Sequence, residues 1–474
     1  MMRARWVPAI FVGGAVLLAS GCRVPREKYQ APVAPQVDAK VAWSAQVTGG
    51  AVVKEVDEAS LAHWWSVFED AELSSLEERA LKSNLDLRTA TSEIAQAQAT
   101  REYYRANLYP TVSGSLSGGG TATTTRTGAD ANTSSNSLGL TASWEPDFFG
   151  GLRKNVAAYE ATLEAKKENL RSVMVSLTAE LALDYIDLRS YQAQLQVTES
   201  NLVKYRETAE MTRAKRESGL ASDLDVTQAM ETVQSTEAGI PTLETNIKKS
   251  SDAIAILLGV RPGSMDEELA AVKPVPKIPA SVAVGITADL IRRRPDVRMA
   301  ERNYAAQWNQ LGVAKANMYP TFTLSGSFAS SAAALLNVVT TNASSVSSIT
   351  GAFSQTLLNR KALKAQVHLQ SALLDQYELA YESSVLGAVQ DVEDALKAYG
   401  AEQVRNKSLA ESADSAEKAA AMSQDLYASG LKDFLTVLDS ERTMLAAQQS
   451  LVVSDATVAE NLVRVYKAMG GGWQ

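Results

Sequence analysis

The chain is poor in the residues that build metal and redox centres. Its 474 residues include one cysteine and two histidines, which leaves few donors for a transition-metal site. His63 and His368 stand alone on stretches of helical pattern, without a partner at catalytic or ligand spacing. The glycine run Gly118–Gly120 precedes threonines rather than a helix, unlike a phosphate-binding loop. The sequence therefore predicts a protein that is not an enzyme and holds no metal.

Acidic residues outnumber basic ones, with 54 Asp and Glu against 46 Lys and Arg. The formal net charge is −8, and it becomes about −10 if Arg3 and Arg5 are removed with a leader peptide. A nucleic-acid-binding protein needs a basic face, so nucleic-acid partners are not expected. Aromatic residues make up only 6% of the chain, and the dominance of Ala, Ser, Leu, Val, Glu and Gln is typical of long helices. After the first 22 residues no segment resembles a transmembrane helix.

The only cysteine ends the clearest local motif. Two arginines precede a short apolar stretch from Val7 to Leu18, as in a secretory leader. The next residues, up to Cys22, resemble a bacterial lipobox, which predicts a signal peptide over 1–21 and covalent lipid, including palmitate, on Cys22. The alternative is an ordinary secretory leader followed by an unrelated cysteine. Arg23 stands where inner-membrane retention signals have Asp, which favours the outer membrane.

A short segment occurs twice, 210 residues apart. Residues 106–111 read Ala-Asn-Leu-Tyr-Pro-Thr and residues 316–321 read Ala-Asn-Met-Tyr-Pro-Thr. Each lies where a helical pattern gives way to apolar residues that alternate with Ser, Thr and Gly. Proline cannot continue a helix and disfavours the α conformation of the residue before it. We therefore interpret Tyr109-Pro110 and Tyr319-Pro320 as helix-to-strand switches.

Offsets of 210 or 211 residues recur along the chain, which indicates an internal duplication. The matching pairs include Asp86 with Asp296, Gly219 with Gly430, and Gly259 with Gly470. Each repeat is expected to contain a short helix, a β-hairpin and two long helices. The expected segments are the lipid-anchored stretch 22–60, repeat 1 at 61–263, a linker at 264–285 and repeat 2 at 286–474. The expected hairpins are 109–146 and 319–357, and the expected long helices are 151–216, 221–258, 360–426 and 432–469.

The hairpin strands have one apolar face and one Ser, Thr and Gly face. In an outer membrane, the apolar face would contact lipid and the polar face a wet lumen. Four strands cannot close a barrel, and open sheet edges do not occur in lipid, so several chains must build the barrel. Two chains would give eight strands with a nearly filled interior, whereas three would give twelve and an open lumen. The heptad-patterned helices, about 100 Å long, likewise need long partners, as in a coiled coil.

Several motifs of the chain resemble those of one family. They are Trp64–Asp70, Trp144–Gly150, Ser218–Ala221, Ile240–Glu244, the doubled Tyr-Pro-Thr and Gly470–Trp473. This set resembles the outer-membrane factors of tripartite efflux pumps, the TolC-like exit ducts, in the lipoprotein branch often labelled OprM/NodT. The resemblance covers essentially the whole mature chain. It implies a homotrimer with a 12-stranded transmembrane β-barrel, four strands per chain, continuous with a periplasmic α-helical barrel.

The resemblance also implies a function and partners. The expected function is passive conduction of small molecules such as drugs or metal ions to the cell exterior, as in multidrug resistance. The expected partners are a periplasmic adaptor, an inner-membrane pump of the RND type and outer-membrane lipid. Two other functions stay open. One is a protein-secretion exit duct, which the lipobox disfavours, and the other is a coiled-coil lipoprotein without a pore, which the alternating hairpins disfavour.

In the family, the turn between the two long helices lies at the closed periplasmic tip. The family's constricting Leu and the Asp four residues later match Leu435 and Asp439, one helical turn apart. Three copies of Asp439 would form an acidic ring that selects cations and resists closure by repulsion. The alternative is that Leu435 belongs to a coiled-coil core and Asp439 to a solvated face. The counterparts in repeat 1, Leu224 and Gln228, lack the acid.

The two turns themselves carry a Gly-Leu pair each, Gly219-Leu220 and Gly430-Leu431. The glycines are expected to stop the preceding helices in the left-handed conformation. The resemblance adds a second role, since these tips would form the surface on which adaptor tips dock.

Overall fold

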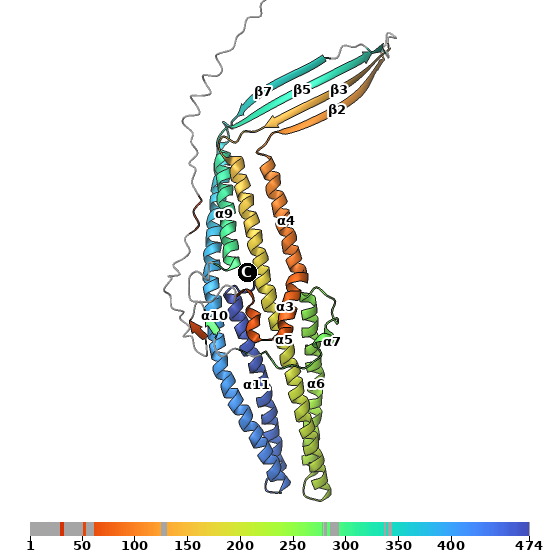
Figure 1. Cartoon of the computed structure of the whole chain (residues 1–474), viewed down its shortest axis with the longest axis vertical. Helices are drawn as coiled ribbons and strands as arrows, with labels where there is room; N and C mark the ends of the chain where they lie inside the picture. Colours follow the sequence, from red (N-terminus) through yellow and green to blue (C-terminus); the bar gives the residue numbers. More distant parts are fainter. Residues whose placement is uncertain are drawn as a thin grey trace, which may run out of the picture. The chain divides into compact units, whose positions relative to one another are not determined.

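The computed structural model describes residues 29–32, 51–53, 61–124, 130–276, 278, 282–284, 293–335, 338–339 and 344–473. These residues fall into two units (Figure 1). Unit 1 comprises 1–33, 94–166 and 299–381, and unit 2 comprises 34–93, 167–298 and 382–474. Each unit draws on both halves of the sequence, so the division does not follow the repeat. The predicted leader peptide and Cys22 lie outside the described residues.

The chain is mainly helical, and corresponding helices have nearly equal lengths in the two halves. The first half contains η1 (Trp64–Phe68), α3 (Ala71–Ser83), α4 (Leu85–Ala106), α5 (Gly151–Glu217), α6 (Asp223–Leu257) and α7 (Asp266–Leu269). The second half contains α9 (Pro295–Ala316), α10 (Arg360–Ala428) and α11 (Phe434–Ala468). Helices α5 and α10 have 67 and 69 residues, and α6 and α11 have 35 each, so the duplication seen in the sequence is a duplication of structure. In the described part of the chain, no helix combines the length and apolarity needed to cross a membrane.

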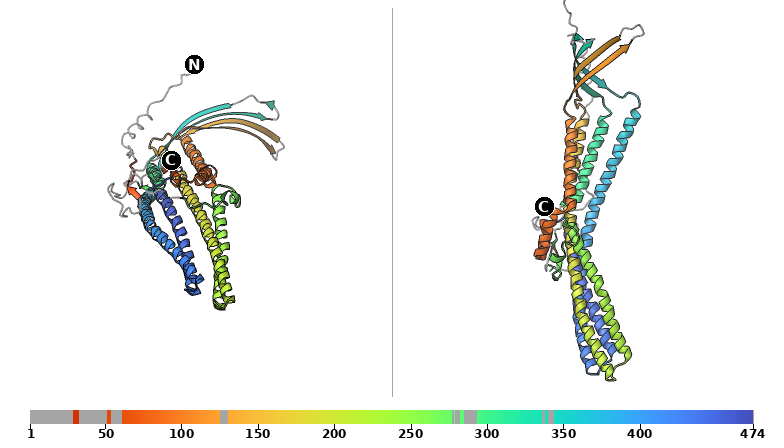
Figure 2. Two further views of the ribbon diagram at one scale, coloured as in Figure 1. Left: turned by 60° about the horizontal axis from the view of Figure 1, so that its bottom comes forward. Right: turned by 90° about the vertical axis from the view of Figure 1, so that its right-hand side faces the viewer.

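Unit 1 contains one antiparallel sheet built from both hairpins. Its strands are β2 (Thr111–Thr124), β3 (Asp130–Trp144), β5 (Thr321–Leu335), the two-residue β6 (Val338–Val339) and β7 (Ser344–Ser354). The long strands follow the order β2–β3–β5–β7, because β3 of the first hairpin pairs with β5 of the second. Figure 2 shows that this sheet is curved. The predicted fold class, mainly α with an antiparallel sheet and a two-fold internal repeat, is confirmed.

Paired aromatic and charged side chains hold the helices of unit 1 together. The ring of Tyr104 on α4 stacks on that of Tyr159 on α5, with centroids 3.9 Å apart. One turn away, Arg101 donates to Glu160 at 2.8 Å. Arg302 on α9 reaches Glu164 of α5 at 2.8 Å. Helix α5 is thus the common partner of α4 and α9 in this unit.

The segment expected to be a simple linker contains regular structure. It includes the single turn of α7 and the strand β4 (Val282–Val284). Strand β4 pairs in parallel with β1 (Ala51–Val53), which comes from the stretch expected to be an extended N-terminal segment. The linker and the N-terminal segment therefore share backbone hydrogen bonds in unit 2.

The hydrophobic core of unit 2 brings η1 together with the C-terminal helix α11. Trp64 of η1 is 1% exposed and stacks on Tyr466 of α11, with ring centroids 5.5 Å apart. Around them lie buried residues from α3, α5, α6, α10 and α11, among them Leu73, Leu76, Leu181, Ile186, Leu188, Ile254, Tyr399 and Leu462. Asp70 caps α3 by accepting hydrogen bonds from the backbone of Glu72 and Leu73, at 2.9 and 3.0 Å, which fixes where this helix enters the core.

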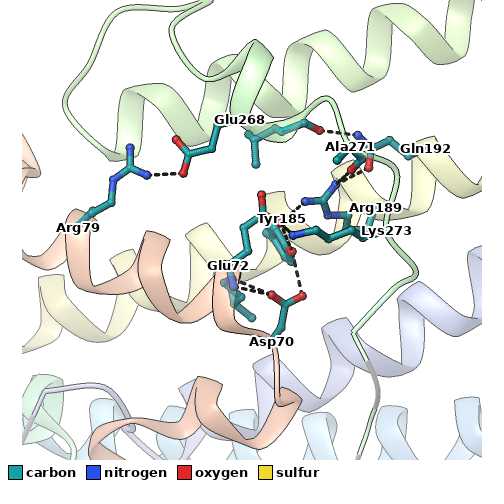
Figure 3. A network of polar contacts seen from close by, with 11 residues as sticks. Asp70, Glu72, Arg79, Tyr185, Arg189, Gln192, Glu268, Ala271 and Lys273 are labelled. Atoms are coloured by element: carbon teal, nitrogen blue, oxygen red, sulfur yellow. Dashed lines mark hydrogen bonds and ion pairs between the residues drawn. The ribbon is translucent and has the colours of Figure 1, made fainter.

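A buried polar network ties the linker to this core (Figure 3). Arg189 of α5 is fully buried and donates to Glu72 of α3 at 2.6 Å and to the carbonyl of Ala271 in the linker at 2.7 Å. Lys273 of the linker also pairs with Glu72. Gln192 accepts from Arg189 at 2.7 Å and donates to the carbonyl of Leu269 at 2.8 Å.

Removal of any one member of this network takes a partner from at least one other member. A buried ion pair is costly to break, because the surviving charge is left without a partner in a medium of low polarity. Arg189 is therefore the residue on which the attachment of the linker depends. By contrast, the nearby pair of Arg79 with Glu268 joins side chains that are 41% and 44% exposed, so water replaces it at little cost.

We therefore predict that Arg189→Ala lowers the free energy of unfolding by about 3–5 kcal/mol. The matched change Arg79→Ala should cost at most about 1 kcal/mol. Denaturant unfolding of the purified protein, followed by far-ultraviolet circular dichroism, measures both. Equal effects of the two substitutions would contradict the central role of Arg189.

Candidate functional site

The sheet of unit 1 has one apolar face whose large side chains are mostly exposed. The register places Leu140 opposite Phe328 and Phe322 opposite Phe353 on this face. Its large side chains are those of Val112, Leu116, Leu138, Leu140, Trp144, Phe322, Leu324, Phe328, Ile349 and Phe353. Leu116 and Ile349 are 82% and 85% exposed. A continuous exposed face of this kind marks a surface that contacts lipid or another apolar partner.

The opposite face is lined by hydroxyl groups that bond across the strands. Hydroxyl pairs link Ser113 to Thr141 at 2.8 Å and Ser117 to Ser137 at 2.7 Å between β2 and β3. Ser327 and Ser348 form the same contact at 2.8 Å between β5 and β7. This face suits water, as the lumen-facing side of an outer-membrane strand does.

The sheet ends in open edges within the described residues. Strand β2 pairs only with β3, and β7 pairs only with β5. Each edge therefore presents backbone N–H and C=O groups that remain available for another strand.

The doubled Tyr-Pro-Thr lies where helix gives way to strand in both halves. Helix α4 ends at Ala106 and β2 begins at Thr111, while α9 ends at Ala316 and β5 begins at Thr321. The backbone N–H of Tyr109 donates to the carbonyl of Ala106 at 3.0 Å, and that of Tyr319 donates to Ala316 at 3.0 Å. The connecting residues thus have the same geometry in both repeats.

The long helices of unit 2 double back at two tight turns (Figure 2). At the first turn the N–H of Leu220 donates to the carbonyl of Lys215 at 2.8 Å and that of Gly219 to Arg216 at 2.9 Å. The second turn repeats this pattern, with Leu431 bonded to Leu426 at 2.8 Å. Both glycines have φ of +76° and open space where a Cβ would lie. They are therefore required by backbone conformation, as in a Schellman motif, and not by crowding.

The helices that follow the turns are capped by side chains. Ser222 and Asp225 form a capping box at the start of α6, and Asp433 accepts from the backbone of Thr436 at 3.0 Å at the start of α11. Because both ends of each turn are fixed by hydrogen bonds, the exposed Leu220 and Leu431, at 76% and 72%, are held on well-defined loops.

Leu435 and Asp439 lie on the exposed face of the first turns of α11. Leu435 is 56% exposed, and Asp439 is also exposed. The core at this level is formed instead by Phe434, Val437 and Leu438. Within one chain Leu435 is therefore not a coiled-coil core residue, and both side chains are available to contact other copies or solvent. The repeat-1 counterpart Leu224 is likewise exposed, at 64%.

Buried polar contacts join the two helical hairpins close to their tips. Glu441 of α11 is 2% exposed and accepts from the hydroxyl of Thr208 on α5 and the amide of Gln424 on α10, both at 2.6 Å. Tyr205 of α5 donates to the backbone carbonyl of Glu441 at 2.9 Å. Burial raises the pKa of the Glu441 carboxyl, although the two side-chain hydrogen bonds act in the lowering direction.

A further contact at this level joins equivalent positions of the two repeats. Arg442 of α11 pairs with Glu231 of α6 at 2.5 Å and bonds Thr232 at 3.2 Å. Positions 231 and 442 are separated by the same offset of 211 residues that separates the hairpin glycines. The sequence contains a signal for this pair, because the two equivalent positions of the repeat have opposite charges. Such residues can pair where the two repeats pack against each other. Nearby, Lys215 of α5 bonds the carbonyl of Tyr427 and lies over its ring, 4.1 Å from the centroid.

Comparison with known proteins decides the family. The family model described as outer membrane efflux protein matches residues 76–260 and 287–471, one match in each repeat. The chain belongs to the outer membrane efflux protein family. This outer membrane efflux protein is 33% identical over 460 residues to Nodulation protein T of Rhizobium leguminosarum bv. trifolii, with 96% of each chain covered. It is 30% identical over 469 residues to the solvent efflux pump outer membrane protein SrpC of Pseudomonas putida, with 97% of each covered.

Among solved structures, this efflux protein resembles the outer-membrane channel OprN. The TM-score is 0.83 at 30% sequence identity, and the match covers 93% of this chain and 99% of OprN. The outer-membrane location expected from the sequence is supported by these relatives. The two-faced sheet thus belongs to a protein of the outer membrane, where its apolar face has lipid as a natural partner.

We predict that the two sheet faces respond oppositely to a charge. Ile349 and Thr350 are neighbours in β7 whose side chains lie on the apolar and the hydroxyl face, respectively. Ile349→Arg should destabilise membrane insertion by about 2–4 kcal/mol and reduce the amount of protein in washed outer membranes, whereas Thr350→Arg should leave it near the wild-type amount. A reversed order would mean that the faces are misassigned.

We also predict opposite effects of alanine at two kinds of glycine. Gly430→Ala should lower the free energy of unfolding by about 1–2 kcal/mol, because an L-residue is strained in the left-handed conformation. Gly239 lies inside α6, exposed and with open space around it, so Gly239→Ala should raise stability by up to about 1 kcal/mol. Thermal unfolding of the two variants measures the difference. A neutral Gly430→Ala would show that the turn does not need its left-handed residue.

Proposed function

We propose that three copies of this chain form a lipid-anchored exit duct in the outer membrane. Small molecules delivered by an inner-membrane pump and a periplasmic adaptor pass through it to the exterior. The observation that carries this proposal is the sheet, whose four long strands have an apolar face, a hydroxyl face and two open edges. Pairing of the β2 edge of one chain with the β7 edge of the next would close the sheet, and closure is what lipid demands.

Three copies fit the function better than two. Eight strands would enclose an interior nearly filled by side chains, whereas twelve leave an open lumen. The sheet of one chain is already curved, as a segment of a barrel wall must be (Figure 2). The helices α5, α6, α10 and α11 would continue the duct as a helical barrel, with their partners supplied by neighbouring copies.

The partners follow from the relatives. SrpC is named as the outer membrane protein of a solvent efflux pump, so a dedicated pump is the expected source of energy and of substrate choice. The proposed duct is passive, and no residue is assigned a catalytic role. The adaptor would dock on the two tips, where Gly219 and Gly430 hold the exposed Leu220 and Leu431. Lipid on Cys22 would give a second attachment to the membrane.

The tip is proposed to be the gate. Leu435 and Asp439 are exposed on one face of α11, one turn apart. Around a three-fold axis, the Leu435 side chains would narrow the opening, and the Asp439 carboxylates would form a ring of negative charge. Such a ring attracts cations and opposes its own closure. Only repeat 2 supplies the acid, because Gln228 stands at the equivalent position of repeat 1.

The gate is tested by conductance in a planar lipid bilayer. We expect Leu435→Ala to raise the single-channel conductance, since the constriction widens, and Asp439→Asn to lower the preference for cations over anions. Asp414→Asn is the control, because Asp414 is an exposed carboxylate of α10 that pairs with Lys418 at 2.6 Å. If Asp414→Asn changed the ion preference as much as Asp439→Asn, the gate assignment would be wrong.

The same recordings test the duct itself. A coiled-coil lipoprotein without a pore would show no conductance in the wild type. Unaltered ion selectivity in Asp439→Asn, together with a normal wild-type conductance, would contradict the gate assignment but not the proposed exit duct. The two parts of the proposal can therefore fail separately.

A further inference from the structure

A tyrosine from the N-terminal segment is seated on α9 in unit 1. The hydroxyl of Tyr29 donates a hydrogen bond to the carboxylate of Glu301. Its ring meets that of Trp308 edge to face, with centroids 5.7 Å apart, and that of Tyr304 at 6.3 Å. The residue is half-buried, although it lies 270 or more positions from its partners in the sequence.

The surface that receives Tyr29 is built by other contacts of α9. Lys154 of α5 lies over the ring of Trp308, 3.7 Å from the centroid, so this indole is held by a cation–π interaction. Arg302 pairs with Glu301 at 2.5 Å and with Glu164 of α5 at 2.8 Å. The acceptor of the Tyr29 hydrogen bond is therefore fixed in place independently of Tyr29.

Physical chemistry favours a stable contact here. Edge-to-face aromatic pairs and a charge-assisted hydrogen bond both gain from partial exclusion of water. Burial and the neighbouring Glu301 carboxylate raise the pKa of the Tyr29 hydroxyl, which keeps it protonated and able to donate.

We propose that Glu301, Tyr304 and Trp308 form a docking site for the chain's own N-terminal segment, occupied by Tyr29, and that this site limits how far the lipid on Cys22 can reach. The second half of the inference rests on the proposed lipidation of Cys22. The first half does not, because the contact is formed by the protein alone.

The chain lengths agree with this role. Cys22 and Tyr29 are seven positions apart in the sequence, which allows a reach of at most about 25 Å. From Trp308 to the end of α9 at Ala316 the helix rises about 12 Å, and β5 begins at Thr321. The greatest reach of the tether therefore exceeds the remaining rise of α9 by about 13 Å, and this difference is available for the connection between α9 and β5.

The docking itself is tested by photo-crosslinking. We expect benzoyl-phenylalanine in place of Tyr29 to form adducts within the same chain, in the tryptic peptide from Asn303 to Lys315. The same probe in place of the exposed Ala31 should give much less of this adduct. Adducts to a second chain, or equal yields from both positions, would overturn the docking site.

The tether is tested by shortening it. Deletion of residues 24–28 leaves only Arg23 between Cys22 and Tyr29, a reach of about 7 Å. We expect loss of most of the assembled protein from the outer membrane, and recovery when Tyr29→Ala is added, because the docked residue no longer limits the reach. Tolerance of the deletion alone, or failure of Tyr29→Ala to restore assembly, would overturn the proposed limit on reach.

Two controls separate this inference from the lipidation on which it rests. Metabolic labelling with palmitate shows whether each variant carries lipid, and in a Cys22→Ser background the deletion should have no effect. If the wild type took up no label, the limit on lipid reach would be overturned, while the crosslink would still decide the docking site.

Tyr103→Ala, which removes a 67% exposed tyrosine of α4, controls for the loss of an aromatic side chain and should not rescue the deletion.

Discussion

The structure depends on the open edges of one sheet. Lipid cannot satisfy backbone N–H and C=O groups, so a sheet with an apolar face can lie in a membrane only if both of its edges are paired. In this chain β2 and β7 each have one partner among the described strands. A single copy is therefore incomplete as a membrane structure, and the need for neighbouring copies follows from hydrogen bonding before any relative is considered. The apolar and hydroxyl faces then determine which side of the closed sheet would meet lipid and which would meet water.

The helical part of the protein is arranged around the same requirement. Exposed apolar side chains at the tips of long helices are unfavourable in water. Packing against further copies of the chain would bury them. Within one chain, the buried contacts of Glu441 and the surface pair of Glu231 with Arg442 hold the two helical hairpins together. Arg189 and Glu72 fasten the linker to the core of unit 2. These contacts hold the elements of each copy together, while the side chains of Leu435 and Asp439 remain exposed.

Much of this architecture could be predicted from the sequence, because its signals are local or periodic. The doubled Tyr-Pro-Thr, the alternation in the hairpins and the constant offset are all visible in the order of residues. The contacts made by Arg189 are different, since nothing near this residue in the sequence indicates that it is buried against a linker some 80 positions away. The single turn of α7 and the pairing of β1 with β4 were missed for a similar reason. Short elements have weak intrinsic preferences, and distant partners stabilise them.

The central claim is that three identical chains close one barrel. Native mass spectrometry of the detergent-extracted protein, released from the detergent in the gas phase, measures the number of chains directly. The account predicts one dominant species of three chains, with the monomer appearing only when the assembly is dissociated. A stable monomer or dimer from freshly extracted membranes would contradict it, because neither closes four strands per chain around an open lumen.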